Sequence, residues 1–436
     1  MTGRKVIMNF PVTATSHSLA DYRARGGYQT LAKVLREMRP EQVTKEVVAS
    51  GILGHGGAAF PAGRKWGVIK LNDEQPHYLC ANADEGEPGT FKDRWILENA
   101  PHLLLESMLI SAYALQVHHA FVYIRGEFDL PYRRLAAAVE EAYDGGYFGK
   151  ALVGSDFACD IVIYRGAGSY VCGEASALIT SIEGKKGYPR NRPPRLTVRG
   201  LYQRPTVINN VETLANVTAI VAQGGQAFRQ IGTAKSPGTQ LVSISGHVQR
   251  PGVYELEYGT PLAAFIEEDC GGVLGGGQLK CIVPGGISTK VLTAAEITTV
   301  TYDHASLTAA GSGVGSGGMV VIAEGTCMVR LLQILLRFYH HESCGQCTPC
   351  REGMGWMHRI IDRIVAGQGR PEDIEQLARI SRANDGTTIC GMGDAAGYAT
   401  LGILAKYRDE FEYFIQHRRS KFDGRLEVEG PEAAHA

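Results

Sequence analysis

Four cysteines near the C-terminus could bind a metal cluster. Cys344, Cys347 and Cys350 are each separated by two residues, and Cys390 follows in a later segment. Three closely spaced cysteines with one remote cysteine are typical of a [4Fe–4S] cluster. Structural zinc usually takes its ligands from two separated Cys-x2-Cys pairs, so the spacing favours the cluster over zinc. A disulfide is the weakest alternative, because the chain has only 10 unevenly spread cysteines in 436 residues.

A glycine-rich segment upstream could approach a phosphate or a flat ring. Residues 51–66 read GILGHGGAAFPAGRKW. Glycine lacks a Cβ and lets backbone amides come close to a ligand, and Lys65 adds a positive charge. The segment could equally be a flexible turn. No strand leads directly into it, as the Gly-x-Gly-x-x-Gly dinucleotide fingerprint requires.

Acidic residues follow the predicted strand 77–83. Asp84, Glu85 and Glu87 lie within four residues of one another, in a loop shaped by glycine and proline. Each could belong to a solvated acidic turn. Open α/β sheets bind ligands at the C-terminal ends of their strands, so this position favours a binding site.

Later segments could contribute to the same site. The predicted strand 160–165 runs into a glycine-rich turn and a helix, an order that places amides at a helix N-terminus and favours an anion site. The loop 184–204 is rich in Lys, Arg and Pro, and is either a basic surface loop or a cover over anionic groups. Asn209 and Asn210 then precede another helix and offer neutral hydrogen-bonding groups.

Several kinds of element must position these residues. Alternating strands and helices predict a layered α/β domain, preceded by one helical stretch over 30–49. Period-2 alternation after Thr239 predicts a β-grasp-like module, and residues 309–318 are interpreted as a Gly/Ser linker. Amphipathic periodicity then predicts a bundle of four helices. These helices are expected over 328–339, 351–365, 371–383 and 395–418.

The charge balance excludes some classes of function. Lys+Arg number 44 and Asp+Glu 45, which leaves a formal net charge of -1. A sequence-independent nucleic-acid binder would need a strongly basic surface. No apolar run is long enough to span a bilayer, so a cytoplasmic protein is expected.

Four motifs together resemble the NADH-binding flavoprotein subunits of respiratory complex I. They are NADEGEPG at 82–89, GAGSYVCGE at 166–174, INNVET at 208–213 and ESCGQCTPCR at 342–351. The resemblance covers about residues 18–413 and implies a Rossmann-like FMN-binding domain, a β-grasp domain of the SLBB type and a four-helix bundle with a [4Fe–4S] cluster. The expected boundaries are 1–65 for the N-terminal helices and glycine loop, 66–235 for the α/β domain, 236–323 for the β-grasp domain and 324–436 for the bundle.

The resemblance also assigns residues to ligands. Those expected to hold FMN are Gly54, Gly56, Gly57, Gly63, Lys65, Asn82, Asp84, Asn209 and Asn210. Those expected at the nicotinamide nucleotide and in the pocket shared with the flavin are Phe60, Glu85, Glu87, Tyr170, Gly173 and Glu174. Glu85 and Glu87 are the expected catalytic pair, in the sense of positioning the substrate. The metal ligands are the four cysteines named above.

The implied activity is that of an NADH dehydrogenase. A nicotinamide delivers two electrons as hydride and an iron–sulfur cluster accepts one, so a flavin must lie between them. We expect hydride transfer from nicotinamide C4 to flavin N5. Single electrons would then pass to the cluster, to a [2Fe–2S] E-type subunit and a large multi-cluster G-type subunit, and on toward quinone. Such a protein would lie peripherally on the cytoplasmic face of the inner membrane. The alternative is the diaphorase subunit of an NAD(P)-dependent formate dehydrogenase or hydrogenase.

Some positions depart from the family pattern. His55, Ala59 and Ala62 stand where the glycine loop usually has Arg, Gly and Thr. Ala175 replaces a carboxylate, and Arg195 replaces the Phe that usually follows the Pro-Pro pair. A carboxylate near the adenosine ribose repels a 2′-phosphate, so its loss and the gain of an arginine are the changes expected for use of NADP(H) beside NAD(H). Weaker stacking of the nucleotide and compensation elsewhere in the chain are the alternatives.

Overall fold

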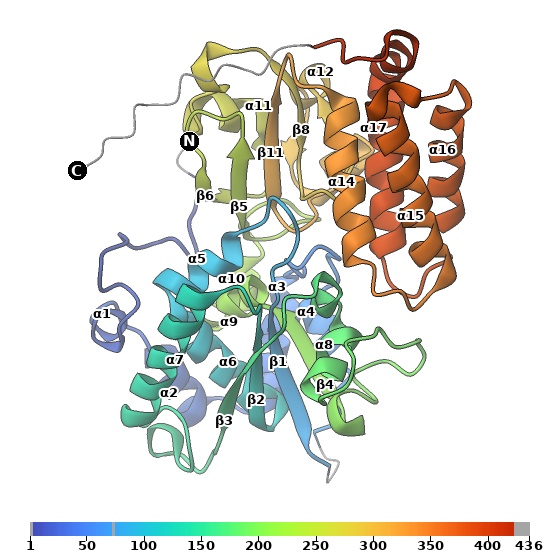
Figure 1. The fold of residues 1–436 in the computed structure, drawn as a ribbon. Helices are drawn as coiled ribbons and strands as arrows, with labels where there is room; N and C mark the ends of the chain where they lie inside the picture. The colour runs from blue at the N-terminus through green and yellow to red at the C-terminus, as the bar shows by residue number, and fades with distance from the viewer. Residues whose placement is uncertain (1–2, 72–74, 423–436) are drawn as a thin grey trace, which may run out of the picture.

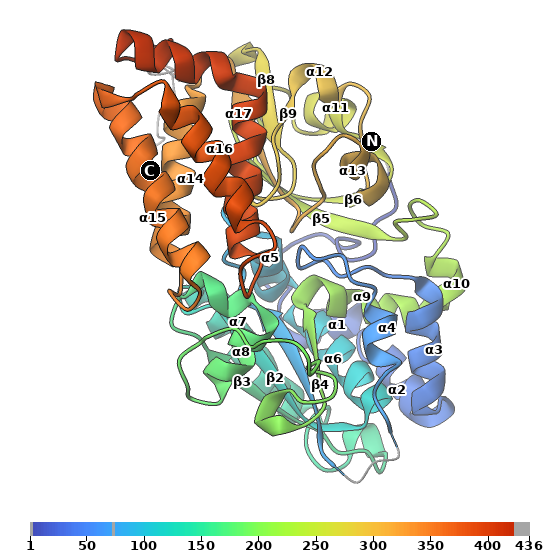
Figure 2. The same ribbon diagram turned by 90° about the vertical axis from the view of Figure 1, so that its right-hand side faces the viewer.

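The computed structural model describes residues 3–71 and 75–422, which form three packed parts. An α/β domain lies at the bottom of Figure 1, a mixed β-sheet domain lies above it, and a bundle of long helices stands beside that sheet. Figure 2 shows that the sheet domain and the bundle both rest on the same end of the α/β domain.

A parallel sheet forms the centre of the α/β domain. Its strand order is β3-β2-β1-β4, and every pair in it is parallel. The strands are β1 (His77–Ala83), β2 (Val117–Ile124), β3 (Asp160–Arg165) and β4 (Thr206–Asn210). The helices that follow them are α5 (Lys92–Asn99), α6 (Pro101–Leu115), α7 (Asp129–Asp144), α8 (Ala175–Ile182), α9 (Val211–Gln223) and α10 (Gly225–Phe228). Because parallel strands point the same way, their C-terminal ends meet at one edge. The expected Rossmann-like α/β class is confirmed.

The N-terminal helices pack on this domain. They are α1 (Leu19–Ala24), α2 (Gln29–Glu37), α3 (Pro40–Ser50) and α4 (Ala62–Trp66). Their buried residues, such as Leu31 and Val43, belong to the same hydrophobic core as the sheet. The single helix expected over 30–49 is wrong, because Met38 and Arg39 are extended before Pro40. The proline ring clashes with a helical residue before it, so the chain must restart as a second helix.

A five-stranded mixed sheet, in the order β6-β5-β11-β8-β9, forms the second part. The strands are β5 (Thr239–Gly246), β6 (Gly252–Glu257), β8 (Leu279–Val283), β9 (Leu292–Thr293) and β11 (Gly318–Ala323), with a small pair β7 (Thr260–Pro261) and β10 (Thr301–Tyr302). Short helices α11 (Leu262–Ala264), α12 (Ala294–Ile297) and α13 (His304–Ala309) cover it. The interpretation of 309–318 as a linker into the bundle is wrong. This loop leads into β11, the central strand of the sheet, which pairs with both β5 and β8.

Four helices form the C-terminal bundle, as predicted. They are α14 (Met328–Glu342), α15 (Thr348–Arg363), α16 (Glu372–Asn384) and α17 (Met392–His417). Their apolar faces bury Leu332, Met354, Leu377 and Phe411 in one core, which also includes residues of α8 such as Leu178. No helix in the described part of the chain is long and apolar enough to cross a membrane.

A buried ion pair joins the sheet domain to the bundle. Lys280 of β8 and Glu410 of α17 are paired at 2.5 Å, with 3% and 5% of their side chains exposed. The Glu410 carboxylate also accepts a hydrogen bond of 2.9 Å from the backbone N–H of Met328, the first residue of α14. The Glu410 carboxylate therefore neutralises a buried ammonium and accepts a hydrogen bond from the first backbone N–H of α14.

We predict that Glu410→Ala lowers the free energy of unfolding by about 3–5 kcal/mol, because it leaves Lys280 buried without a counter-charge. Urea denaturation followed by circular dichroism measures the change. Arg408→Ala is the matched control, since it removes two exposed pairs on the same helix, with Glu375 and Glu412, and it should change stability by about 1 kcal/mol or less. Equal effects of the two substitutions would contradict the prediction.

Candidate functional site

The glycine loop of residues 54–57 lies between two parts of the structure. A Cβ on Gly56 would stand 3.3 Å from the Cβ of Asn210, and the nearest neighbours of a Cβ on Gly57 are Gly315 and Ser316 of the loop into β11. Gly57 also has φ +103°, a conformation that residues with a Cβ rarely adopt. The loop therefore has a physical reason for its glycines.

Ala59 occupies a position where the backbone favours glycine. Its φ is +50°, and the other described residues of this loop with a Cβ have negative φ. The turn is closed by the N–H of Gly54, which donates to the carbonyl of Phe60 at 3.1 Å. Phe60 itself is 49% exposed. Ala59 is thus strained directly beside the aromatic residue expected at the nucleotide.

The first residues after β1 connect two loops at the C-terminal edge. Asn82 accepts a hydrogen bond from the Asp84 N–H at 3.1 Å and donates from Nδ2 to the carbonyl of Gly173 at 2.7 Å. A Cβ on Gly173 would lie 3.2 Å from the carbonyl oxygen of Asp84. Asn82 and Gly173 therefore hold the loops after β1 and β3 together.

Asp84 is a buried carboxyl with an unsatisfied atom. Burial raises its pKa to about 7, and the nearby Arg125 guanidinium, 3.8 Å away, lowers it. Asp84 Oδ2 and Arg125 Nη1 are both buried and have no hydrogen-bond partner among the described residues. Two unsatisfied polar atoms at the C-terminal edge of the sheet are the kind of feature that a polar ligand would complete.

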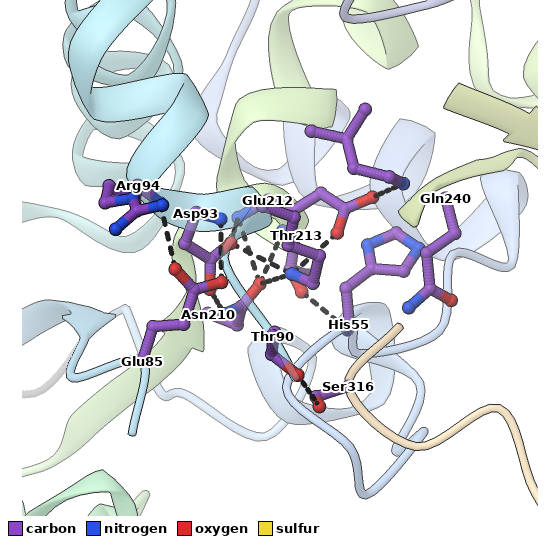
Figure 3. A network of polar contacts seen from close by, with 12 residues as sticks. His55, Glu85, Thr90, Asp93, Arg94, Asn210, Glu212, Thr213, Gln240 and Ser316 are labelled. Atoms are coloured by element: carbon purple, nitrogen blue, oxygen red, sulfur yellow. Dashed lines mark hydrogen bonds and ion pairs between the residues drawn. The ribbon is translucent and has the colours of Figure 1, made fainter. Parts of the chain in front are cut away.

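A fully buried ammonium lies under the glycine loop. Lys92 contacts Asp93 at 2.9 Å and Glu212 at 2.7 Å. Glu85 accepts hydrogen bonds from the N–H groups of Asp93 and Arg94 at the start of α5, at 2.8 and 3.0 Å. Figure 3 shows Glu85, Asp93 and Glu212 gathered around Asn210. Burial raises the pKa of Glu85 and of Glu212 to about 7; the charge of Asp93 adds to the rise, and the Lys92 ammonium opposes it.

The two asparagines at the end of β4 have separate partners. Asn210 caps α9 by accepting from the N–H of Glu212 at 3.0 Å. Asn209 Oδ1 accepts from the indole N–H of Trp66 at 3.1 Å. Lys65, on the same short helix α4, donates to the carbonyl of Ile208 at 2.7 Å. Burial lowers the Lys65 pKa to about 8. Gly63 packs α4 against α3, because a Cβ there would stand 2.6 Å from Val48 Cα.

Tyr170 connects all three parts of the molecule. Its hydroxyl donates to Glu87 at 2.5 Å, and its backbone N–H donates to Glu342 of α14 at 3.0 Å. The other Glu87 oxygen accepts from the N–H and hydroxyl of Ser288 in the sheet domain, at 2.8 and 2.6 Å. Burial raises the Glu87 pKa, and these hydrogen bonds oppose that rise. The Tyr170 ring also packs edge-on against Phe338.

The four cysteines come together at the end of the bundle nearest the α/β domain. Cys344 and Cys347 lie between α14 and α15, Cys350 lies in the first turn of α15, and Cys390 lies just before α17. Burial raises the pKa of Cys350 to about 11, and the other three thiols contribute to that rise. Among the described residues, no three potential ligands converge as a single metal ion would require. The preference for a [4Fe–4S] cluster over zinc rests on the spacing of three close cysteines and one remote cysteine.

Glu174 lies between the two predicted centres. It caps α8 by accepting from the N–H groups of Ser176 and Ala177, at 2.8 and 3.0 Å, and it pairs with Arg192 at 2.6 Å. Its charge also raises the pKa of Cys390, after the larger effect of burial. A cavity of about 500 Å³ is lined by Glu174, Arg192 and Cys390 among others. The flavin motifs and the cysteines therefore border one region.

The residues present fit both implied groups. A flavin mononucleotide needs a cradle of small residues, cations for its phosphate and polar groups for its ring. Gly54, Gly56 and Gly57 supply the cradle, Lys65 supplies a cation, and Asp84 supplies an unsatisfied polar atom. The individual contacts of the predicted residues with FMN and with a nicotinamide nucleotide stay predictions.

Sequence reasoning missed several residues that build the site. They are Thr90, Lys92, Asp93, Arg125, Glu212, Ser288, Ser316 and Glu342. Glu212 and Glu342 were visible within the INNVET and ESCGQCTPCR motifs. Ser288 and Ser316 gave no signal, because they belong to the sheet domain and reach the site only through domain packing. Ser316 contacts Thr90, hydroxyl to hydroxyl, at 2.6 Å (Figure 3).

Comparison with known proteins agrees with these parts. The chain matches the Nuo51 FMN-binding domain over residues 47–219, an SLBB domain over 240–322 and the NADH-ubiquinone oxidoreductase-F iron-sulfur binding region over 330–414. The NADH-quinone oxidoreductase F subunit 2 of Rhizobium meliloti (strain 1021) is 48% identical over 93% of this chain and 96% of its own length. The corresponding F subunit of Mycobacterium tuberculosis (strain ATCC 25618 / H37Rv) is 45% identical over 94% of this chain and 93% of its own length.

A solved structure has the same fold. It is an NAD+-reducing [NiFe]-hydrogenase in the H2-reduced state, with a TM-score of 0.81 and 34% sequence identity over 89% of this chain. This chain spans 65% of the length of that hydrogenase chain. The family models confirm the SLBB-type and iron–sulfur parts expected from the sequence.

We predict that Ala59→Gly raises the free energy of unfolding by about 1 kcal/mol, because it removes left-handed strain. The measurement is urea denaturation of the purified protein. Ala58→Gly is the matched control in the same turn. Ala58 does not have positive φ, so its replacement should lower stability. A loss of stability in both variants would refute the account of Ala59.

We also predict a pH-dependent effect of Asp84→Asn. The pKa of Asp84 is about 7 in the folded protein and ordinarily 3.8, so its stabilising contribution is full below about pH 4 and is lost as the pH rises through about 7. The variant should therefore gain stability relative to the parent between pH 4 and pH 8, as measured by urea midpoints. The exposed Asp156→Asn is the control. If the stability difference between Asp84→Asn and the parent does not vary with pH, the raised pKa of Asp84 is wrong.

Proposed function

This chain belongs to the family of NADH-quinone oxidoreductase F subunits, and on that premise we propose that it is an NADH dehydrogenase flavoprotein subunit. It would bind FMN at the C-terminal edge of the parallel sheet and a [4Fe–4S] cluster on Cys344, Cys347, Cys350 and Cys390. The bound flavin supplies the conversion of a two-electron hydride into single electrons. The observation that carries the proposal is the Tyr170 connection, because it joins the loop after β1 to the helix that precedes the cysteines.

The chain's own residues act by positioning. Glu87 is fixed by Tyr170 on one side and Ser288 on the other, so its carboxylate has a defined place beside the site. Glu85 is fixed by two backbone N–H groups of α5. Hydride transfer needs no nucleophile or general base. We therefore assign Glu85 and Glu87 to orienting the nicotinamide nucleotide.

The partners follow from the exit of electrons. A chain with one cluster must pass electrons to another carrier. We propose a [2Fe–2S] subunit of the E type and a large multi-cluster subunit of the G type, in a complex peripheral to the cytoplasmic face of the membrane. The relatives named as subunits of NADH-quinone oxidoreductase support this assembly.

A second function is supported by the hydrogenase likeness. There the same fold occurs in an enzyme that reduces NAD+, so this chain could serve as the diaphorase subunit of a soluble dehydrogenase. The subunits that copurify with this chain in the native complex distinguish the two functions. Membrane subunits and quinone reductase activity support the first function, and a nickel–iron or molybdenum subunit supports the second.

We predict that Cys390→Ala abolishes the [4Fe–4S] EPR signal of the anaerobically reduced protein and retains the yellow flavin and NADH–ferricyanide activity. The thiol is a cluster ligand in the proposal, whereas the flavin residues belong to another domain. Cys327→Ala is the matched control, because Cys327 is also half-buried but lies outside the set. It should retain both signals. Parent protein with neither flavin absorption nor a cluster signal would overturn the proposed function.

A further inference from the structure

A basic cavity lies on the loop that follows α8. It has a volume of about 540 Å³, and five cations line it together with Tyr188. These cations are Lys185, Lys186, Arg190, Arg192 and Arg199. No carboxylate is among its described lining residues. A cavity of this size with this charge is suited to an anionic group rather than to an apolar one.

Only part of this positive charge is neutralised. Arg190 pairs with Glu183 at 2.8 Å and also donates to Thr180 and Gly200. Lys185 lies 3.3 Å from the same Glu183 carboxylate, and Arg192 pairs with Glu174. Five cations against two carboxylates leave a net charge of three positive units.

Lys186 and Arg199 carry the unneutralised charge. Within the described part of the chain, neither side chain has an ion pair, and both are exposed. The Lys186 ammonium lies over the Tyr188 ring, 4.5 Å from its centroid, which orients it by a cation–π contact. Neither cation has a carboxylate partner among the described residues, so a bound anion would not have to displace one.

The cavity is next to the proposed nucleotide site. Arg192 lies close enough to Lys65 for its charge to lower the Lys65 pKa, after the larger effect of burial. Arg192 also lines the cavity shared by Glu174 and Cys390. The first turn of α8, which begins at Ala175, contains no acidic residue. The carboxylate of Glu174, which caps that turn, is paired with Arg192, so its charge is neutralised on the side that faces the basic loop.

We propose that this cavity binds the 2′-phosphate of NADP(H), so that the protein oxidises NADPH as well as NADH. The inference rests on the proposed function. A phosphate monoester carries nearly two negative charges and three acceptor oxygens at neutral pH, which ammonium and guanidinium groups bind through strong charge-assisted hydrogen bonds. NADH lacks this phosphate, so Lys186 and Arg199 discriminate between the two nucleotides without contacting the reacting atoms.

Steady-state kinetics with ferricyanide test the proposal. One NADPH gives up a hydride and two ferricyanide ions each take one electron, which leaves NADP+, one proton and two ferrocyanide ions. The parent should use NADPH with kcat/KM within about tenfold of that for NADH. Lys186→Gln with Arg199→Gln should raise KM for NADPH at least about tenfold, because the charge-assisted hydrogen bonds of both cations to the 2′-phosphate are lost. KM for NADH and kcat for both should stay unchanged.

Three controls show whether the effect is specific to these two cations and whether the cavity recognises the 2′-phosphate of a nucleotide or any phosphate. Lys150→Gln removes an exposed lysine near the start of β3, at the opposite edge of the sheet, and should change neither KM. Adenosine 2′,5′-bisphosphate should inhibit the parent more strongly than adenosine 5′-monophosphate, and the double variant should lose that difference. Inhibition by inorganic phosphate alone, equal for the two nucleotides, would identify a general anion site and overturn the inference.

Two further outcomes distinguish failure of this inference from failure of the proposed function. Active NADH oxidation with a kcat/KM for NADPH more than about tenfold below that for NADH would overturn the inference and leave the proposed function standing. Absence of bound flavin and of NADH oxidation would overturn the proposed function itself.

Discussion

The burial of the Lys92 ammonium constrains the whole site. A buried ammonium must be surrounded by carboxylates and hydrogen-bond acceptors, because the free energy of unfolding otherwise falls by several kcal/mol. Here Asp93 and Glu212 contact the ammonium directly. Glu212 also accepts from the N–H of Leu241 in β5, at 2.6 Å, and Asp93 accepts from Asn210 at 2.5 Å. One lysine thereby fixes α5, α9 and the first strand of the next domain in one arrangement.

This arrangement explains why the flavin motifs lie where domains meet. The glycine loop touches the α/β domain at Asn210 and the loop into β11 at Ser316. Glu87 is held by the sheet domain through Ser288, and Tyr170 is held by the bundle through Glu342. Electron transfer between a flavin and a cluster needs a short and constant separation. Hydrogen bonds between domains supply that constancy better than a flexible connection would.

Charge is divided across the site. The side near α5 holds an excess of buried carboxylates, and burial raises the pKa of Glu85 and Glu212 there. The side near α8 holds an excess of exposed cations on residues 185–199. A nicotinamide dinucleotide has a neutral or cationic nicotinamide at one end, a pyrophosphate at its centre and, in NADP(H), a 2′-phosphate on the adenosine at the other end. The polarity of the site therefore matches the polarity of its proposed ligand, with the nicotinamide end on the acidic side.

The sequence alone determined most of the elements and marked the candidate cluster ligands. Hydrophobic periodicity predicted the four bundle helices, and local spacing marked Cys344, Cys347 and Cys350, because both are properties of neighbouring residues. Motif order then identified the family. Tertiary structure decided the rest. Ser288, Ser316 and Glu342 reach the site from distant segments, and Lys92 acquires its role only through burial. The basic loop became a cavity beside Arg192 and Lys65 by packing, which no local pattern encodes, since contacts between residues far apart in the chain depend on how whole domains fit together.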